Sequence, residues 1–349
     1  MNTSTLSDER LEGATRLLRA AGFAGAFSLT PLAGGANNQV FRADVDGGPL
    51  VLKAYFQHPD DPRDRLGAEY SFSSFAWENG VRALPRPLAC DRQSGFALYE
   101  YIPGRKLTPA EVTADAVAQA LDFYLAVNAL KEKARDLPPA SEACFSLCDH
   151  WHCLQRRLRR LDGIEALGEV DREAAAFVQD RLVPVSAACL RAAADAAREL
   201  GLPPEQSLPA GERCVSPSDF GFHNALRTPD GRMVFIDFEY AGWDDPAKTV
   251  SDFFCQPECP VPAEHYAAFA RAVVENESGT AARLRRAELL LPIYRLKWCC
   301  IMLNDFLPAG GKRRRFAGSA DEKERKSRQL RKARQALRRV AAEGADVLC

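Results

Sequence analysis

The sequence contains no apolar run close to the roughly 18–20 residues that a membrane-spanning helix needs. It also lacks an excess of either charge: 46 Lys and Arg stand against 47 Asp and Glu, and the formal net charge is −1. Such a balance gives no general attraction to nucleic acid or to an anionic membrane surface. The first residues are polar and charged, so we expect no signal peptide. These absences favour a cytoplasmic protein with no membrane partner, and they argue against nucleic acid as a partner.

Cysteines at paired, regular spacing are absent as well. The eleven cysteines are scattered along 349 residues, and their odd number argues against a framework of disulfides. One segment combines residue types that bind zinc: Cys144, Cys148, His150, His152 and Cys153. No second pair of ligands follows at the spacing of a zinc finger. We therefore interpret this segment as an amphipathic helix of the core, in a protein that is kept reduced.

The pattern of residues in the first part of the chain predicts a small domain that is rich in strands. A helix is expected over 7–21. Asp61 and Pro62 predict the N-cap and the first position of a second helix, which ends near Glu78. Apolar runs with turn residues between them predict the strands of this domain: 26–32, 39–45, 50–56, 86–91 and 96–102.

After residue 104 the sequence becomes mostly helical. Apolar residues at helical spacing predict the following helices: 110–131, 144–161, 173–200 and 263–275. A turn-rich stretch interrupts them and ends in a predicted strand over 233–236. This pattern predicts an α+β fold with a small first lobe over 1–102, a hinge near 99–104 and a larger helical lobe over 105–349.

Three oxygen-bearing side chains stand out in the second lobe. Asp219 and Asn224 form an Asp-x4-Asn pattern, and Asp237 closes an apolar strand further along the chain. Phosphoryl transfer needs one carboxylate to orient the attacking hydroxyl, and an amide oxygen and a second carboxylate to hold Mg²⁺ against ATP. We predict Asp219 as the catalytic base and Asn224 and Asp237 as metal ligands. The alternative is an Asx-rich turn before a strand, which loops often contain.

The segment over 216–252 resembles the catalytic region of the aminoglycoside phosphotransferase and choline kinase superfamily, where the catalytic loop and the metal-binding Asp have this order and spacing. The run from Ile236 to Gly242 is especially similar to the choline/ethanolamine kinase version. The resemblance implies a protein-kinase-like fold of two lobes, with one helix in a small antiparallel β-rich lobe. It also implies ATP- and Mg²⁺-dependent transfer of the γ-phosphate to a small-molecule hydroxyl. One position departs, because Pro217 stands where the superfamily usually has a loop-supporting His.

The first lobe offers the cation that such a kinase requires. Lys53 lies between apolar residues on a predicted strand, where an unpaired ammonium is costly. Glu69 follows on the predicted helix and can hold that ammonium. We predict that Lys53 binds the ATP phosphates and that Glu69 holds Lys53. The alternative is a lysine that extends its ammonium to solvent and a glutamate on the surface.

Small residues between the first two predicted strands allow backbone amides to approach phosphate oxygens closely. Gly34, Gly35 and Asn37 are the candidates, and their place ahead of the Lys53 strand resembles the nucleotide-covering loop of the superfamily. At the expected hinge, backbone groups from Glu100 to Ile102 are predicted to hydrogen-bond the adenine.

The acceptor stays open between three classes of small molecule. An amino alcohol such as choline needs aromatic faces around its cation, and the aromatic candidates are Trp151, Tyr240, Trp243, Tyr294 and Trp298. An aminoglycoside needs clustered carboxylates, and the acidic candidates are Glu239, Asp244, Asp245 and Asp305. A sugar needs neutral hydrogen-bonding groups, which the sequence does not locate.

Two further polar residues are of interest beside the predicted catalytic ones. His223 directly precedes Asn224, and we interpret it as a histidine that packs the loop. Asp252 lies in a predicted helix, and we expect its buried carboxylate to steady the catalytic loop.

Residues 312–339 are strongly basic, with 13 Lys or Arg against three Asp or Glu. Leu330, Ala333 and Leu337 recur at helical spacing, so we expect a docked helix with a solvated basic face. Two other functions remain open. This helix is a candidate for binding nucleic acid or another anionic surface, and Pro217 motivates the hypothesis of a kinase-like scaffold with weak catalysis.

Overall fold

The structure is a computed structural model, and it describes residues 6–32, 38–57, 61, 63–275, 280–307 and 322–347. The described residues form two compact units. The described residues of the sheet unit come from Met1–Ser141 and Pro217–Gly242. Those of the helical unit come from Glu142–Ser216, Trp243–Gly311 and Ala320–Cys349. The predicted catalytic segment therefore lies in the sheet unit. The lobe boundaries predicted at 1–102 and 105–349 remain a prediction.

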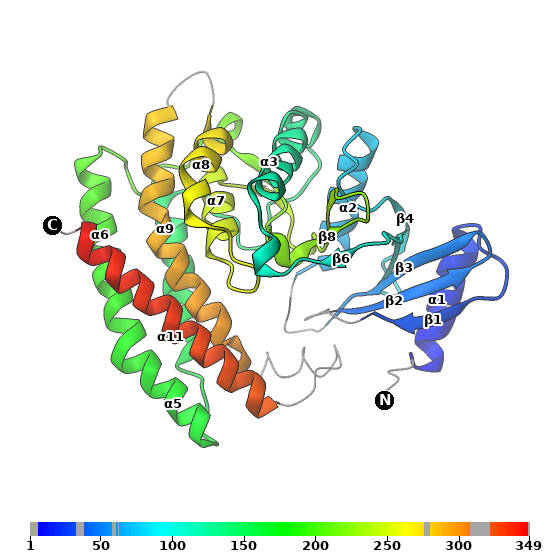
Figure 1. The fold of residues 1–349 in the computed structure, drawn as a ribbon, viewed down its shortest axis with the longest axis horizontal. Coiled ribbons are helices and arrows are strands. Elements are labelled where there is room, and N and C mark those ends of the chain that lie inside the picture. Colours follow the sequence, from blue (N-terminus) through cyan, green and yellow to red (C-terminus); the bar gives the residue numbers. More distant parts are fainter. Residues whose placement is uncertain are drawn as a thin grey trace. The chain divides into compact units, whose positions relative to one another are not determined.

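A five-stranded antiparallel sheet organises the sheet unit (Figure 1). Its strands are ordered β1 (Ser28–Pro31), β2 (Gln39–Val45), β3 (Gly48–Ala54), β5 (Phe96–Glu100) and β4 (Pro87–Asp91). Gly47, in the turn from β2 to β3, has a φ of 104°, a conformation that glycine adopts at little cost. The predicted strands of this domain are confirmed, with ends that differ by a few residues.

Side chains alternate between the two faces of this sheet, as the two-residue period of a strand requires. Leu52 belongs to the apolar core that packs on helix α1 (Asp8–Ala20). Tyr99 belongs to the core of the opposite face, which packs on helix α2 (Arg65–Glu78). Lys53 follows Leu52 and therefore points to the α2 face, where it meets a carboxylate of that helix.

Helix α2 begins later than the sequence predicts. Asp64, and not Asp61, is its N-cap, because Asp64 Oδ1 accepts a 2.8 Å hydrogen bond from the backbone N–H of Gly67. Asp61 instead lies 2.7 Å from a guanidinium nitrogen of Arg65. Because the Asp61 carboxylate pairs with the side chains of Arg63 and Arg65 and does not accept from the helix backbone, the prediction of Asp61 as the cap was wrong. Pro62 lies outside the described residues.

A smaller sheet completes the sheet unit around the predicted catalytic segment. It consists of β6 (Arg105–Lys106), β8 (Ala225–Arg227) and β9 (Met233–Phe235), and helix α3 (Ala114–Asn128) packs on β9. The strand predicted over 233–236 is confirmed. Because β8 and β9 pair as a hairpin, the residues before β8 meet those after β9, and the backbone N–H of Ile236 donates to the carbonyl of Asn224 at 2.9 Å.

Helices make up most of the helical unit (Figure 1). They are α4 (Leu147–Leu161), α5 (Glu169–Phe177), α6 (Val183–Glu199), α7 (Pro246–Cys255), α8 (Tyr266–Val274), α9 (Thr280–Met302) and α11 (Glu322–Val347). The short strands β7 (Cys214–Ser216) and β10 (Gly242–Asp244) pair with each other. The helix predicted over 173–200 is divided by a π-helical turn, Val178–Leu182, which ends two residues before Pro184. Pro184 has no N–H to donate to that turn. None of the helices in the described part of the chain is long and apolar enough to cross a membrane.

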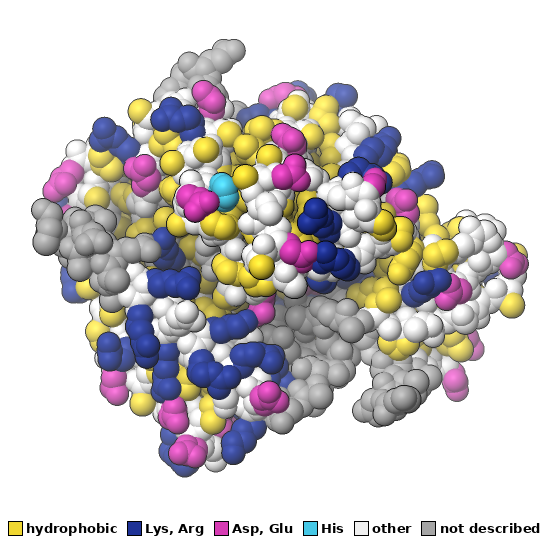
Figure 2. Space-filling view, in the orientation of Figure 1, with side chains coloured by type: hydrophobic (Ala, Val, Ile, Leu, Met, Phe, Trp, Pro, Cys, Tyr) yellow, Lys and Arg dark blue, Asp and Glu magenta, His cyan; other side chains and the backbone are white. Residues whose placement is uncertain are grey.

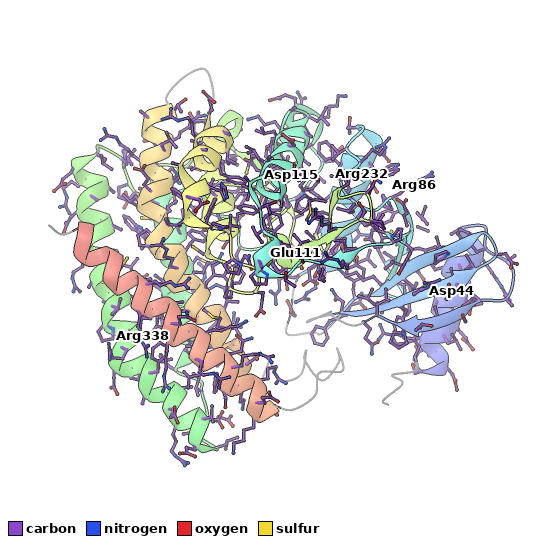
Figure 3. The ribbon with its side chains drawn as sticks, viewed as in Figure 1. Asp44, Arg86, Glu111, Asp115, Arg232 and Arg338 are labelled. Carbon is purple, nitrogen blue, oxygen red and sulfur yellow. The ribbon has the colours of Figure 1, made fainter. Side chains whose placement is uncertain are left out.

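The C-terminal helix α11 docks through one face, as predicted. Leu330, Ala333 and Leu337 are buried in the core that α11 shares with α9. Lys and Arg side chains gather over its outer face in Figure 2, and Arg338, labelled on this helix in Figure 3, is exposed. Residues 312–321 of the basic segment lie outside the described residues.

Candidate active site

The predicted base Asp219 lies in a tight loop between β7 and β8. Ser218, directly before it, has a φ of 66°, in the left-handed region that residues other than glycine rarely adopt. Such a conformation costs about 1–3 kcal/mol and persists only where its surroundings hold it. Asn224 supplies part of that hold, because its Nδ2 donates to the carbonyl oxygen of Asp219 at 3.0 Å and lies 3.4 Å from Oδ2 of the same residue. The structure thus brings two of the predicted residues together.

The predicted metal ligand Asp237 follows β9 and also has a left-handed backbone, with a φ of 70°. Its Oδ1 lies 2.5 Å from Nζ of Lys53, and the same ammonium lies 2.6 Å from Oε2 of Glu69. The predicted pair of Lys53 and Glu69 is therefore present, and Asp237 joins it. Lys53 is 6% exposed and Glu69 is 5% exposed, so the alternative of a solvent-extended lysine beside a surface glutamate was wrong.

Charge pairing keeps the buried Lys53 ionised. Burial by itself would lower the pKa of Lys53, but the carboxylates of Asp237 and Glu69 outweigh burial and raise that pKa above its usual value. An ammonium without partners would be costly at this depth. Lys53 and Glu69 are buried and Asp237 is half-buried, and the three side chains form one cluster in which Lys53 carries a positive charge at neutral pH.

A buried phenylalanine follows each of the two aspartates. Phe220 comes directly after Asp219, and Phe238 comes directly after Asp237. Both rings pack against Phe123 of α3, each at a centroid distance of 5.9 Å. The turns that carry Asp219 and Asp237 are thus packed on one aromatic core, which fixes the position of one aspartate relative to the other.

A cavity of about 310 Å³ opens beside these side chains. Lys53, Glu69, Asn224 and Asp237 are part of its wall. Asp219 does not line the cavity and meets its wall through Asn224. Much of the remaining lining is apolar: Leu32, Val40, Val51, Pro85, Leu226, Ile236 and Phe238. A cavity with charged groups in one part and apolar side chains in another suits a ligand with an anionic end and a flat apolar end.

The predicted nucleotide contacts divide into two groups. Three of them lie outside the described residues: Gly34, Gly35 and Asn37. Glu100 and Ile102 line the cavity, as predicted for the hinge. The backbone N–H of Glu100 already donates to the carbonyl of Arg86 at 2.9 Å. The Glu100 N–H is therefore not available to adenine, and the predicted backbone donor must lie beyond Glu100.

Glu239 extends the charged cluster, and sequence reasoning missed this role. Its Oε2 accepts a 2.6 Å hydrogen bond from Nδ2 of Asn38 and lies 3.4 Å from Nε of Arg65. Burial and the charge of Asp237 raise the pKa of Glu239. The sequence made Glu239 a candidate contact to a cationic acceptor, but in the structure its carboxylate is buried against Asn38 and Arg65. The available signal was the repetition of acids at positions 237 and 239, directly after the predicted strand.

Two polar residues have other partners than the sequence predicts. His223 does more than pack the loop, since its Nε2 lies 3.2 Å from Oδ1 of Asp219. Asp252 accepts from Nζ of Lys297 at 2.7 Å and from Nε1 of Trp298 at 2.9 Å. Because both partners belong to α9, Asp252 holds α7 to α9. The prediction that it steadies the catalytic loop was therefore wrong.

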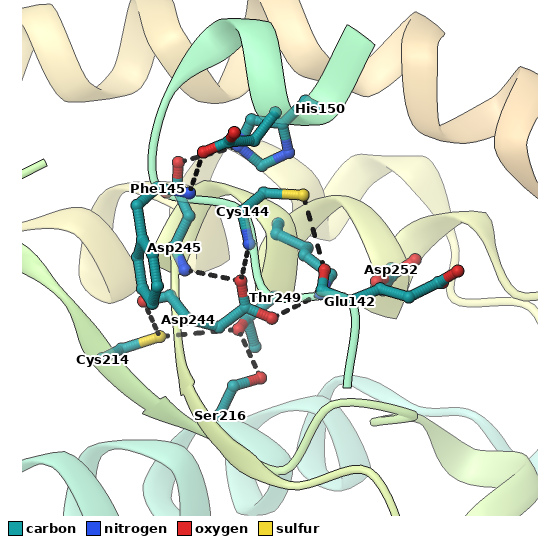
Figure 4. A network of polar contacts seen from close by, with 12 residues as sticks. Glu142, Cys144, Phe145, His150, Cys214, Ser216, Asp244, Asp245, Thr249 and Asp252 are labelled. Carbon is teal, nitrogen blue, oxygen red and sulfur yellow. Dashed lines mark hydrogen bonds and ion pairs between the residues drawn. The ribbon is translucent and has the colours of Figure 1, made fainter. Parts of the chain in front are cut away.

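The remaining acids considered for an aminoglycoside are buried and paired within the helical unit, and Figure 4 shows Asp244 and Asp245 in their polar network. Asp244 pairs with Lys248, and Asp245 lies 2.7 Å from a guanidinium nitrogen of Arg286. Asp305 is likewise buried, with an arginine partner at 3.1 Å. Each of these carboxylates therefore has a cationic partner inside the protein, and together they do not form an open anionic surface.

His150 of the Cys- and His-rich segment is also part of this internal network. Its Nε2 lies 3.0 Å from Oδ2 of Asp245, and its Nδ1 lies 2.7 Å from the hydroxyl of Tyr294. With 1% exposure it is a core residue. Among the described residues, no group of three or more His, Cys, Asp or Glu side chains is arranged to hold a metal ion.

Two of the aromatic candidates already face cations of the protein. The ring of Tyr240 lies under Arg63 and Arg65, whose guanidinium carbons are 5.5 Å and 5.8 Å from its centroid. The ring of Tyr294 lies 4.3 Å from Nζ of Lys297. These two faces are therefore occupied, and the aromatic candidates that remain are Trp151, Trp243 and Trp298.

The donor set in the cavity fits a hard divalent cation. Asn224 directs its amide N–H toward Asp219, which leaves its Oδ1 as an oxygen donor, and Asp237 presents a carboxylate to the same cavity. In phosphotransferases Mg²⁺ is bound by one or two carboxylates together with phosphate oxygens. An amide oxygen and a carboxylate, without Cys or His, match that preference.

Known proteins share this fold. A choline/ethanolamine kinase family protein from Mesorhizobium loti is 19% identical, with a TM-score of 0.58 over 94% of this chain and 95% of that one. The choline kinase LicA from Streptococcus pneumoniae is 15% identical, with a TM-score of 0.56 over 94% of this chain and 98% of that one. A spectinomycin phosphotransferase, solved with ADP and spectinomycin, is 11% identical, with a TM-score of 0.59 over 95% and 97%.

At these identities the likeness shows the fold, and the predicted protein-kinase-like fold is confirmed. No curated protein sequence matches the chain. The sequence does match the family described as "Phosphotransferase enzyme family" over residues 28–286. Because this match covers well over half of the 349 residues, the chain belongs to the phosphotransferase enzyme family.

Proposed function

We propose that this protein transfers the γ-phosphoryl group of ATP to a hydroxyl of a small molecule, in a reaction that depends on Mg²⁺. One observation carries the proposal. The ammonium of Lys53 bridges Glu69 and Asp237 at the wall of a cavity, and Asn224 of the same wall is hydrogen-bonded to Asp219. Solved relatives of the same fold contain ADP or AMP, which supports a nucleotide as the ligand of this cavity.

Each of these side chains has a distinct role in the proposed reaction. Lys53 binds the α- and β-phosphates, and Glu69 keeps its ammonium in place. Asn224 and Asp237 hold Mg²⁺, which supplies positive charge next to the phosphate oxygens. Asp219 orients the acceptor hydroxyl and accepts its proton, as the new P–O bond forms and the bond between the γ-phosphorus and the ADP oxygen breaks.

The rest of the cavity would bind the nucleotide without taking part in bond making. The backbone amides of Gly34, Gly35 and Asn37 would cover the phosphates, and the backbone from Glu100 to Ile102 would recognise adenine, with the N–H donor beyond Glu100. The catalytic effect then comes from positioning and electrostatics, with no covalent intermediate on the enzyme.

The acceptor is a small hydroxyl compound, and the buried acids argue against one of the three classes. Glu239, Asp244, Asp245 and Asp305 are all buried, so a polycationic aminoglycoside has no acidic cluster among them to bind. An amino alcohol with a single cation, or a sugar, does not need a cluster of carboxylates to bind. Choline, ethanolamine and monosaccharides are therefore the first acceptors to test.

A screen that follows ADP release tests this function. Wild-type protein with ATP and Mg²⁺ is offered amino alcohols, monosaccharides and aminoglycosides, and release that depends on one acceptor is the expected result. Asp219→Ala should abolish transfer and leave ATP binding nearly unchanged, since Asp219 does not line the cavity. Loss of ATP binding together with transfer would make Asp219 a structural residue. Absence of acceptor-dependent release from all three classes would contradict the proposed function.

A further inference from the structure

His223 makes a side-chain contact to Asp219 that the resemblance to known kinases does not imply. Its Nε2 lies 3.2 Å from Oδ1 of Asp219, while Nδ2 of Asn224 lies 3.4 Å from Oδ2. The two oxygens of one carboxylate therefore face two neighbouring side chains of the same turn. Because an ionised carboxylate only accepts hydrogen bonds, the imidazole must donate from Nε2.

We propose that His223 is a positioning residue for Asp219: its Nε2–H fixes the direction in which the carboxylate faces the acceptor hydroxyl. This inference rests on the proposed function of Asp219 as the base. It assigns to His223 a task that Pro217 cannot perform, since proline has neither a backbone N–H nor a side-chain donor.

The backbone of His223 is held firmly enough for this task. Lys106 of β6 donates from Nζ to the carbonyl oxygen of His223 at 2.6 Å. On one side of His223 the ring of Phe222 is fully buried, and on the other side the carbonyl of Asn224 accepts from Ile236 at 2.9 Å. The His223 side chain itself is 16% exposed. The backbone that carries the donor is therefore held by Lys106 of β6 and by the residue that follows β9.

The Asp219 carboxylate needs such a contact because the residue directly before it, Ser218, has a strained backbone. The left-handed conformation of Ser218 costs about 1–3 kcal/mol and must be maintained by contacts around it. The Asp219 side chain is 34% exposed, so solvent alone would let it rotate. A misplacement of about 1 Å at a reacting group can cost roughly 100-fold in rate.

The position of the contact predicts which kinetic constant changes. His223 touches Asp219, whereas the cavity wall contains Lys53, Asn224 and Asp237 and includes neither Asp219 nor His223. Loss of the imidazole should therefore lower kcat and leave the KM for ATP nearly unchanged. Replacement by a side chain that carries an N–H at a similar reach should restore kcat.

The test compares His223→Leu with His223→Gln in the full-length protein. Leu removes the donor, and Gln places an amide N–H at about the distance of Nε2. We expect His223→Leu to lower kcat roughly 10- to 100-fold and His223→Gln to recover most of that loss, with melting temperatures and ATP affinity close to wild type. His265→Leu, a half-buried histidine of the helical unit, is the matched control and should keep the wild-type kcat.

A second measurement does not depend on activity, so it separates this inference from the proposed function. The chain has five histidines, and the imidazole ¹⁵N shifts of His223 can be assigned by their absence in His223→Gln. A proton on Nε2, with shifts that move in Asp219→Ala, is the expected result. Unchanged shifts in Asp219→Ala would overturn the inference even if the enzyme proved inactive. In an active enzyme, a wild-type kcat for His223→Leu, or equal losses in the Leu and Gln variants, would also overturn it.

Discussion

Nζ of Lys53 lies 2.5 Å from Oδ1 of Asp237, although 184 positions separate the two residues in the sequence. This contact joins strand β3 to the segment that follows β9. It also means that Lys53 has two carboxylate partners before any ligand arrives, since Glu69 lies 2.6 Å from the same ammonium. A triphosphate and its metal ion would exchange partners with this pair: Asp237 would turn to the metal, and Lys53 would turn to the phosphates.

Replacement of Lys53 by Met should weaken ATP binding more than any change on the surface. A hydrogen bond to a charged group is worth about 1.5–3 kcal/mol, so the dissociation constant for ATP should rise about 10- to 150-fold. Titration calorimetry with ATP and Mg²⁺ measures it directly. Lys133→Met, which changes an exposed lysine, is the control. Wild-type affinity in Lys53→Met would show that the phosphates lie elsewhere.

Replacement of Asp237 by Asn should raise the Mg²⁺ concentration needed for half-maximal activity by at least about 10-fold, because a neutral amide is a weaker ligand for Mg²⁺ than a carboxylate. EDTA should stop the wild-type reaction. Initial rates over a Mg²⁺ series at fixed ATP report the shift. Asp115→Asn, at the exposed acid labelled in Figure 3, should behave as wild type. An identical Mg²⁺ dependence in Asp237→Asn would remove Asp237 from the metal site.

Acid should destabilise the protein partly through Asp245. Burial by itself would raise the pKa of Asp245, but Arg286 and His150 outweigh it and lower that pKa to about 2. The unfolded chain takes up the proton near pH 3.8, so the stabilisation is complete above that pH and disappears as the pH falls toward 2. The full difference is about 2–3 kcal/mol.

Urea denaturation between pH 5 and about pH 2.5 measures this loss. Asp245→Asn is the matched variant, because Asn also caps helices well and Asp245 accepts from the backbone of Ala247 at the start of α7. The free energy of unfolding should fall less steeply with pH in Asp245→Asn than in wild type. Equal slopes would mean that other acids cause the acid sensitivity.

Helix α11 should contribute to stability through its apolar face and not through its charges. Leu330 is 2% exposed in the core that α11 shares with α9, so Leu330→Ala should lower the free energy of unfolding by about 2–5 kcal/mol. Leu167→Ala is the control, because Leu167 is 80% exposed and its truncation should change stability by less than about 0.5 kcal/mol. Equal effects of the two substitutions, measured by urea denaturation, would contradict the docked helix.

Much of the fold could be predicted because its signals are local. The strands around Lys53 follow from alternation and turn residues, and the docking face of α11 follows from the spacing of Leu330 and Leu337. The start of α2 could not be predicted in the same way. Asp61 and Asp64 are both good N-caps by residue type, and the choice between them depends on where the guanidinium of Arg65 lies.

The sequence by itself determined which chemical groups the protein has and in what order: an ammonium, a glutamate, and an Asp-x4-Asn pattern followed by another aspartate. Residue type and spacing are covalent properties, so no folding is needed to recognise them. Only the tertiary structure decided which of the many acids serve the cavity. Asp237 meets Lys53, whereas Asp244 and Asp245 neutralise cations of the helical unit. The energy of a charge depends on its burial and its nearest partners, and those are properties of packing and not of position along the chain.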